Sequence, residues 1–192
     1  MPALSRTGTA FRAHRTLGLA VQAAVGEALE NQGLRVKLVD RGFDFEVTLE
    51  TGDIADGSLQ FEVGRSLVEV KATREGEARL TPLQAATAAA EKERYDLCVV
   101  DLRSISADRL SGAWAGVDVE PLARMVPGVG EAVGETWGLV EWARSEQVAI
   151  RNDKALRYAV PHDLWQSGLS ISAWILRIAA DLANEPPSES IS

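Results

Sequence analysis

A run of strictly alternating residues, 43–50, constrains the fold more than any other feature of the chain. Its odd positions are apolar and its even positions are polar. Successive side chains of a β-strand point to opposite faces of the sheet, so this run predicts a strand with one buried face. Residues 34–39 alternate in the same way, and residues 59–63 and 67–73 predict two further strands joined around Gly64.

Helical patterns flank these predicted strands. Apolar residues recur at helical spacing over residues 11–32, and Gly33 follows as a left-handed helix stop. A second helix begins where Thr81 and Gln84 form a capping box, and it continues through an alanine-rich stretch. An apolar strand over residues 95–101 comes next. This order of elements predicts an α/β (α+β) fold, in which a mixed central sheet is flanked by helices.

The second half of the chain has weaker patterns. We expect a helical segment over residues 121–126 and a loop over residues 126–130. A hairpin over residues 147–160, which turns at residues 152–153, and an amphipathic helix over residues 170–183 should follow. All five tryptophans lie in this half, and we expect them to pack in a core or against a partner rather than to stack on bases. The chain therefore divides into a core (1–105), a C-terminal extension (106–184) and a disordered tail (185–192).

The composition is that of an ordinary globular protein. Apolar residues make up 46% of the 192 residues and charged residues 25%, and the sequence has no apolar run long enough to span a membrane. The single cysteine, Cys98, lies within an apolar strand pattern and predicts a buried thiol. The N-terminus lacks the pattern of a secretory signal, so we expect a cytoplasmic protein.

Three polar residues on the predicted strands indicate a catalytic site. Glu69 and Lys71 share one strand face, whereas Val68 and Val70 point into the core. If the strand of Asp44 is a neighbour, two carboxylates and one ammonium group converge. Carboxylate oxygens hold Mg²⁺, and a lysine can orient water or stabilise charge on a phosphate. A Glu-x-Lys pair can also be a weak ion pair on a solvated strand, but the order of the surrounding elements favours the site.

These residues also carry a resemblance to a known family. Residues 42–46, 67–73, 79–84 and 95–100, in this order, resemble the PD-(D/E)XK nuclease-like domains. Within that group, the chain is most similar to the NO VEIN type of C-terminal domain found in bacterial restriction and defence proteins. The resemblance covers about half of the chain and implies a restriction-endonuclease-like core with a C-terminal extension.

The resemblance implies the chemistry of the site. Asp44, Glu69 and Lys71 would form the catalytic triad. Mg²⁺ or Mn²⁺ would be held by Asp44 and Glu69 with the carbonyl group of Val70. The expected reaction is the hydrolysis of phosphodiester bonds.

Three further residues are accessory candidates. Similar domains often have glutamate at the position of Gln84, which here can position water or phosphate or act only as the capping residue. Glu30 on the first helix is a further carboxylate that the resemblance implies. Glu46 shares a strand face with Asp44 and could substitute as a ligand. Glutamates at such positions are commonly solvent-facing, so the alternative for both is a solvated surface residue outside the site.

The function implied by these features is that of a metal-dependent DNA endonuclease in a restriction or phage-defence system. Basic residues near the site would contact DNA, namely Arg65, Arg74 and Arg79, with Arg12 and Arg15 on the first helix. The net charge of −8 opposes strong independent binding, because phosphate contacts supply most non-specific affinity. The alternative is a catalytically silent module of the same fold that acts with a protein partner, as a homodimer or in a larger assembly.

Overall fold

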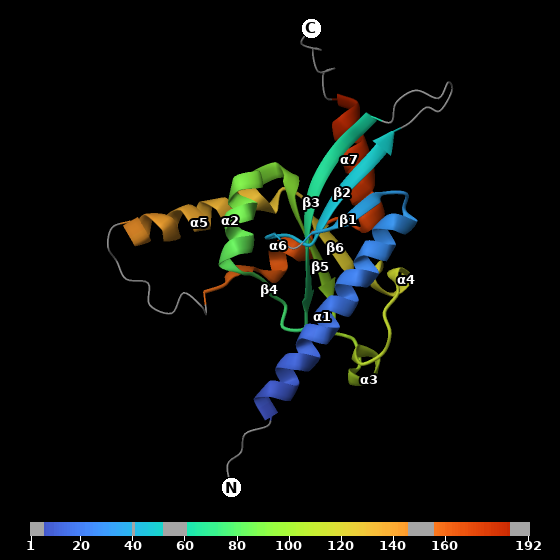
Figure 1. Ribbon diagram of the computed structural model, residues 1–192, viewed down its shortest axis with the longest axis vertical. Coiled ribbons are helices and arrows are strands. Elements are labelled where there is room, and N and C mark those ends of the chain that lie inside the picture. The colour runs from blue at the N-terminus through green and yellow to red at the C-terminus, as the bar shows by residue number, and fades with distance from the viewer. Residues whose placement is uncertain (1–5, 40, 52–60, 146–155, 185–192) are drawn as a thin grey trace.

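The computed structural model describes residues 6–39, 41–51, 61–145 and 156–184 (Figure 1). It confirms the α/β fold class, with a five-stranded mixed sheet flanked by helices. The strands are β1 (Arg35–Leu38), β2 (Phe45–Thr51), β3 (Phe61–Thr73), β4 (Ala78–Leu80), β5 (Tyr95–Asp101), β6 (Ala123–Val126) and β7 (Tyr158–Val160). The helices are α1 (Arg6–Asn31), α2 (Pro82–Glu91), the 3₁₀ turn η1 (Lys92–Arg94), α3 (Ala107–Leu110), α4 (Gly116–Val119), α5 (Val129–Ser145), α6 (His162–Gln166) and α7 (Ile171–Asn184).

The sheet has the strand order β1-β2-β3-β5-β6. Strands β1, β2 and β3 pair antiparallel in succession, β5 runs parallel to β3, and β6 is antiparallel to β5. Strands β4 and β7 form a separate antiparallel pair. Because β2 and β3 are antiparallel, Asp44 just before β2 lies near Glu69 and Lys71 in the C-terminal half of β3.

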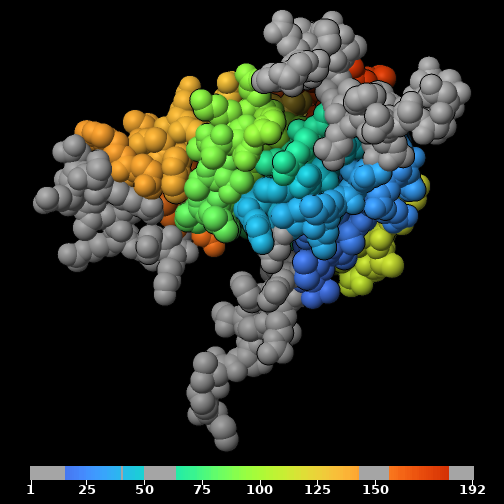
Figure 2. Space-filling view, turned by 45° about the horizontal axis from the view of Figure 1, so that its top comes forward, coloured from blue at the N-terminus to red at the C-terminus, as the bar shows by residue number. Residues whose placement is uncertain are grey.

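Helices cover both faces of the sheet. Val68 and Val70 pack into a core that includes residues of α1 and α7, among them the fully buried Trp174. Leu67 packs into a second core formed with α2, α5 and the buried Trp165 of α6. Helix α1 runs diagonally across the sheet (Figure 1), and α5 lies along α2 (Figure 2). The alternating residues Leu67 and Val68 of β3 therefore point into two different cores.

Locally signalled elements form as predicted. Helix α2 has the capping box, because the side chain of Gln84 accepts a hydrogen bond from the Thr81 amide (2.8 Å) and Thr81 Oγ1 accepts one from the Gln84 amide (3.3 Å). Gly33 has a φ of 84°, as expected for the residue that ends α1. Every residue of β5 except Asp101 is buried, including Cys98. These signals depend only on neighbouring residues.

The prediction of two strands joined around Gly64 is wrong, because β3 is one continuous strand from Phe61 to Thr73. Residues around Gly64 looked like a turn because they are polar or small. Ser66 is instead buried in the sheet, where its hydroxyl donates to the carboxylate of Asp96 (2.6 Å). A polar residue with a buried partner does not interrupt a strand.

Two predictions in the second half are also wrong. Residues 121–126 were expected to be helical, but Ala123–Val126 forms β6, which pairs with β5. The loop expected over residues 126–130 is shorter, because α5 begins at Val129. A four-residue apolar segment cannot be assigned from its pattern alone, and here strand pairing decides its conformation.

The segment after residue 105 shares the sheet and both cores with the first part of the chain. It supplies β6 to the main sheet and β7 to the small one, and the amphipathic helix expected near the C-terminus is α7. The expected hairpin turn at residues 152–153 and the expected tail lie outside the described residues. Among the helices that the structure describes, none combines the length and apolarity required to cross a membrane.

Candidate functional site

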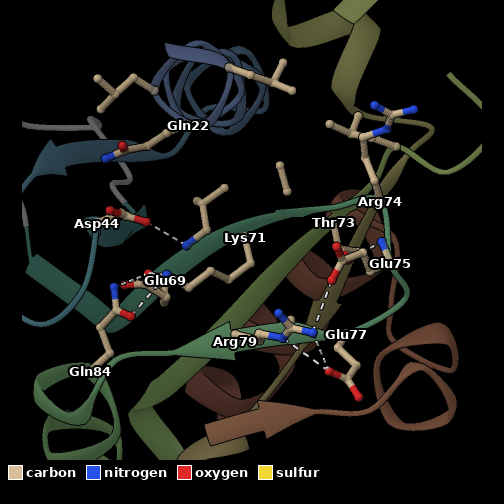
Figure 3. A pocket seen from close by; sticks show the side chains of 17 residues that line it. Gln22, Asp44, Glu69, Lys71, Thr73, Arg74, Glu75, Glu77, Arg79 and Gln84 are labelled. Atoms are coloured by element: carbon tan, nitrogen blue, oxygen red, sulfur yellow. Dashed lines mark hydrogen bonds and ion pairs between the residues drawn. The ribbon is translucent and has the colours of Figure 1, made fainter. Parts of the chain in front are cut away.

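A pocket of about 470 Å³ lies at the edge where β3 ends and β2 begins. We call it the carboxylate pocket, and Figure 3 shows its lining. Asp44, Glu69 and Lys71 line it together, as the sequence predicted. Helix α1 forms one wall, and the turn after β3 with β4 and the start of α2 forms the other.

The pairing of β2 with β3 brings the two carboxylates together. Phe45 pairs with Val68, and the Asp44 amide donates to the Val68 carbonyl (3.1 Å), so Asp44 lies beside Glu69 on the same face of the sheet. The carboxylate of Asp44 accepts a hydrogen bond from the Val70 amide (2.8 Å). The amide and carbonyl of a strand residue point to the same side. The Val70 carbonyl is thus directed to the side on which Asp44 lies.

Glu69 is far more buried than the alternating pattern indicated. It is 1% exposed, because α2 covers this face of the sheet. One of its oxygens, Oε1, forms an ion pair with Lys71 Nζ (2.6 Å) and accepts a hydrogen bond from Gln84 Nε2 (2.5 Å). Gln84 Oε1 in turn accepts a hydrogen bond from Lys71 Nζ (3.1 Å). Gln84 therefore acts both as the capping residue of α2 and as a link between the two charged groups.

The second oxygen of Glu69, Oε2, is buried and has no hydrogen-bond partner among the described residues. Burial raises the pKa of Glu69 to about 7; the charge of Lys71 opposes the rise and that of Asp44 adds to it. Burial also raises the pKa of Tyr95, whose hydroxyl donates to the Gly42 carbonyl (2.9 Å). A buried carboxylate oxygen without a partner is costly unless a ligand or a proton occupies it.

The donor set fits a hard divalent cation. Asp44, Glu69 and the Val70 carbonyl supply oxygen atoms, which Mg²⁺ and Mn²⁺ prefer, and Mg²⁺ commonly uses one or two carboxylates with water and substrate phosphate. Among the described residues, no group of three or more carboxylate, histidine or cysteine side chains is arranged to hold a metal ion. The protein would thus supply only part of a coordination shell. No described residue engages the Oε2 atom of Glu69.

The three arginines proposed for DNA contact lie in different places. Arg74 and Arg79 line the rim of the carboxylate pocket. Arg79 is paired with Glu75 and Glu77, each at 3.1 Å. Arg65 lines a different pocket, and its guanidinium forms an ion pair with Glu46 of β2. The rim near Glu69 is therefore of mixed charge rather than basic. The side chains of Arg12 and Arg15 lie outside the described part of the chain.

The accessory carboxylates are not brought to the site. Glu46 pairs with Arg65 (3.1 Å) and Lys37 (3.8 Å) and does not line the carboxylate pocket. Glu30 is exposed and lines a separate pocket near the C-terminal end of α1. Helix α1 instead contributes the polar side chain of Gln22 to the lining of the pocket. No sequence signal identified Gln22, because the position of α1 over the site depends on long-range packing.

No family model matches the chain, and no curated protein matches it. The resemblance to PD-(D/E)XK domains therefore rests on the motif itself.

Proposed function

We propose that this protein is a metal-dependent phosphodiesterase that hydrolyses DNA, in a restriction or phage-defence system. The observation that carries the proposal is that Asp44, Lys71 and Glu69, whose Oε2 has no partner among the described residues, line one pocket. Two carboxylates beside an ammonium group can hold a cation and a phosphate side by side. A purely structural ion pair would not need a second carboxylate or a pocket.

Each group of the chain has a defined task in this proposal. A bound divalent ion would polarise the phosphate and lower the pKa of a water molecule. Asp44 and Glu69 would hold it with the Val70 carbonyl, and Glu69 must first lose its proton, because only the carboxylate is an effective ligand. Lys71 is fixed by Glu69 and Gln84. It would stabilise the negative charge that builds up on the phosphate oxygens.

One observation favours a second function, that of a silent binding module. Without any cation, Glu69 Oε1 is already engaged by Lys71 and Gln84. Such a network can persist as a structural feature after catalysis is lost. The net charge of −8 also favours a protein partner over free DNA.

Cleavage of supercoiled plasmid separates the two functions. We expect nicked or linear product with Mg²⁺ or Mn²⁺, none with EDTA, and a loss of at least about a hundredfold in rate for Lys71→Ala. Lys37→Ala is the matched control, because Lys37 is 72% exposed on the edge strand β1 and lies outside the carboxylate pocket. Equal rates for the native chain and Lys71→Ala, or no cleavage by either, would support the silent module.

A further inference from the structure

The carboxylate pocket has a buried floor and an exposed rim. Its floor is formed by buried residues, including Glu69 at 1% exposed and Leu102 at 1% exposed. Its rim is open: Leu19 on the α1 side is 57% exposed, and the Arg79 side chain on the other side is 51% exposed. The proposed reacting groups therefore lie below the surface, between two walls (Figure 3).

The two walls differ in chemistry. Helix α1 contributes the apolar side chains of Leu17 and Leu19, whereas the cation Arg79 lies across the pocket from α1 and Arg74 lies at the end of the pocket, in the turn after β3 (Figure 3). An unpaired nucleotide has the same division, with an apolar base face on one side and a phosphate on the other. In a duplex the base faces are stacked inside, so an apolar wall would have no matching surface.

The charge of the rim also disfavours a duplex. Glu75 and Glu77 stand on the same wall as Arg79 and pair with it, so this wall offers little net positive charge. A duplex presents two phosphate backbones and needs a broad basic surface. One strand needs only a local cation, and among the described residues Arg74 at the rim forms no ion pair or hydrogen bond.

We propose that the carboxylate pocket accepts a single nucleic-acid strand, and that the substrate is single-stranded DNA or an unpaired segment of a duplex. This inference rests on the proposed nuclease function. The scissile phosphate would lie over Glu69 and Lys71, with a neighbouring base against Leu17 and Leu19. A pocket of about 470 Å³ holds a nucleotide-sized group.

Binding and cleavage are measured separately. Fluorescence anisotropy with Ca²⁺ in place of Mg²⁺ compares a short labelled oligonucleotide with the blunt duplex of the same sequence. We expect the single strand to bind at least about tenfold more tightly, and Leu19→Ala to weaken this binding about fivefold. Leu176→Ala is the matched control, since Leu176 is 72% exposed on α7 and lies outside the pocket.

The outcomes distinguish this inference from the proposed function. Tighter binding of the duplex, equal binding of both forms, or no binding of either would overturn the single-strand inference. An unaltered affinity in Leu19→Ala would overturn the placement of the base on α1. The single strand can bind as expected while neither DNA form is cleaved in a Lys71-dependent manner with Mg²⁺ or Mn²⁺. That result would contradict the nuclease function but would support the single-strand binding site.

Discussion

At the scale of single residues, Glu69 has the most unusual environment of the three proposed site residues. It is almost fully buried, it shares one oxygen with Lys71 and Gln84, and its other oxygen has no partner among the described residues. The sequence predicted that Glu69 and Lys71 share a strand face. It could not predict the burial, because that depends on α2 packing over the strand.

The burial of Glu69 predicts a specific dependence of stability on pH. Its pKa is about 7 in the folded protein, against 4.5 for an ordinary glutamate. Below about pH 4.5 both the folded and unfolded states hold the proton. As the pH rises toward 7 the unfolded chain releases it first, so the native chain loses up to about 3 kcal/mol of unfolding free energy.

Glu69→Gln removes this titration. We expect the unfolding free energy of the variant, relative to the native chain, to increase by up to about 3 kcal/mol between about pH 4 and pH 8 in urea denaturation. Glu30→Gln is the control, because Glu30 is exposed on α1, and it should not reproduce the change. Parallel stability curves for the native chain and Glu69→Gln would show that Glu69 does not titrate as proposed.

At the scale of elements, the sequence predicted what neighbouring residues determine. The caps of α2, the end of α1 at Gly33 and the buried strand β5 were all correct. Strand β6 was missed because its conformation comes from pairing with β5. The placement of Gln22 at the site was missed for the same reason, since it depends on how α1 packs across the sheet.

The glycine-rich start of α5 allows this helix to pack closely against α2 and η1. Two glycine substitutions test this packing. A β-carbon on Gly130 would collide with the backbone carbonyls of Ala88 and Lys92, whereas one on Gly138 would meet nothing within 4 Å. We expect Gly130→Ala to lower the unfolding free energy by about 2 kcal/mol. Gly138→Ala should raise it by about 0.5–1 kcal/mol through helix propensity. Equal effects of the two substitutions would contradict the close packing of α5 on α2.

At the scale of the whole molecule, the charge distribution limits the affinity for DNA that the proposed function requires. The net charge is −8, and the rim of the carboxylate pocket mixes Arg74 and Arg79 with Glu75 and Glu77. Affinity for DNA should therefore be weak and should depend on a few local contacts. The net charge alone predicts a weak affinity for DNA. Only the structure shows that Arg65 lines a different pocket from Arg74 and Arg79.

Charge reversal at the rim tests the local contact. We expect Arg74→Glu to weaken binding of labelled single-stranded DNA about tenfold at low salt and to reduce the slope of log affinity against log salt by about one. Arg177→Glu changes the net charge equally, but Arg177 lies on α7 and lines a different pocket, so its effect should be much smaller. Equal losses in both variants would indicate that only net charge matters.

Calorimetric titration with Mn²⁺ is the decisive measurement for the divalent-cation site proposed at Asp44 and Glu69. At about pH 8 we expect one ion to bind per folded chain. Because Glu69 must be deprotonated, the affinity should fall about tenfold at pH 6. Binding should be lost in Glu69→Gln and retained in Glu30→Gln. No binding of Mn²⁺ by the native chain, or binding that Glu69→Gln leaves unchanged, would show that Glu69 does not hold a divalent cation.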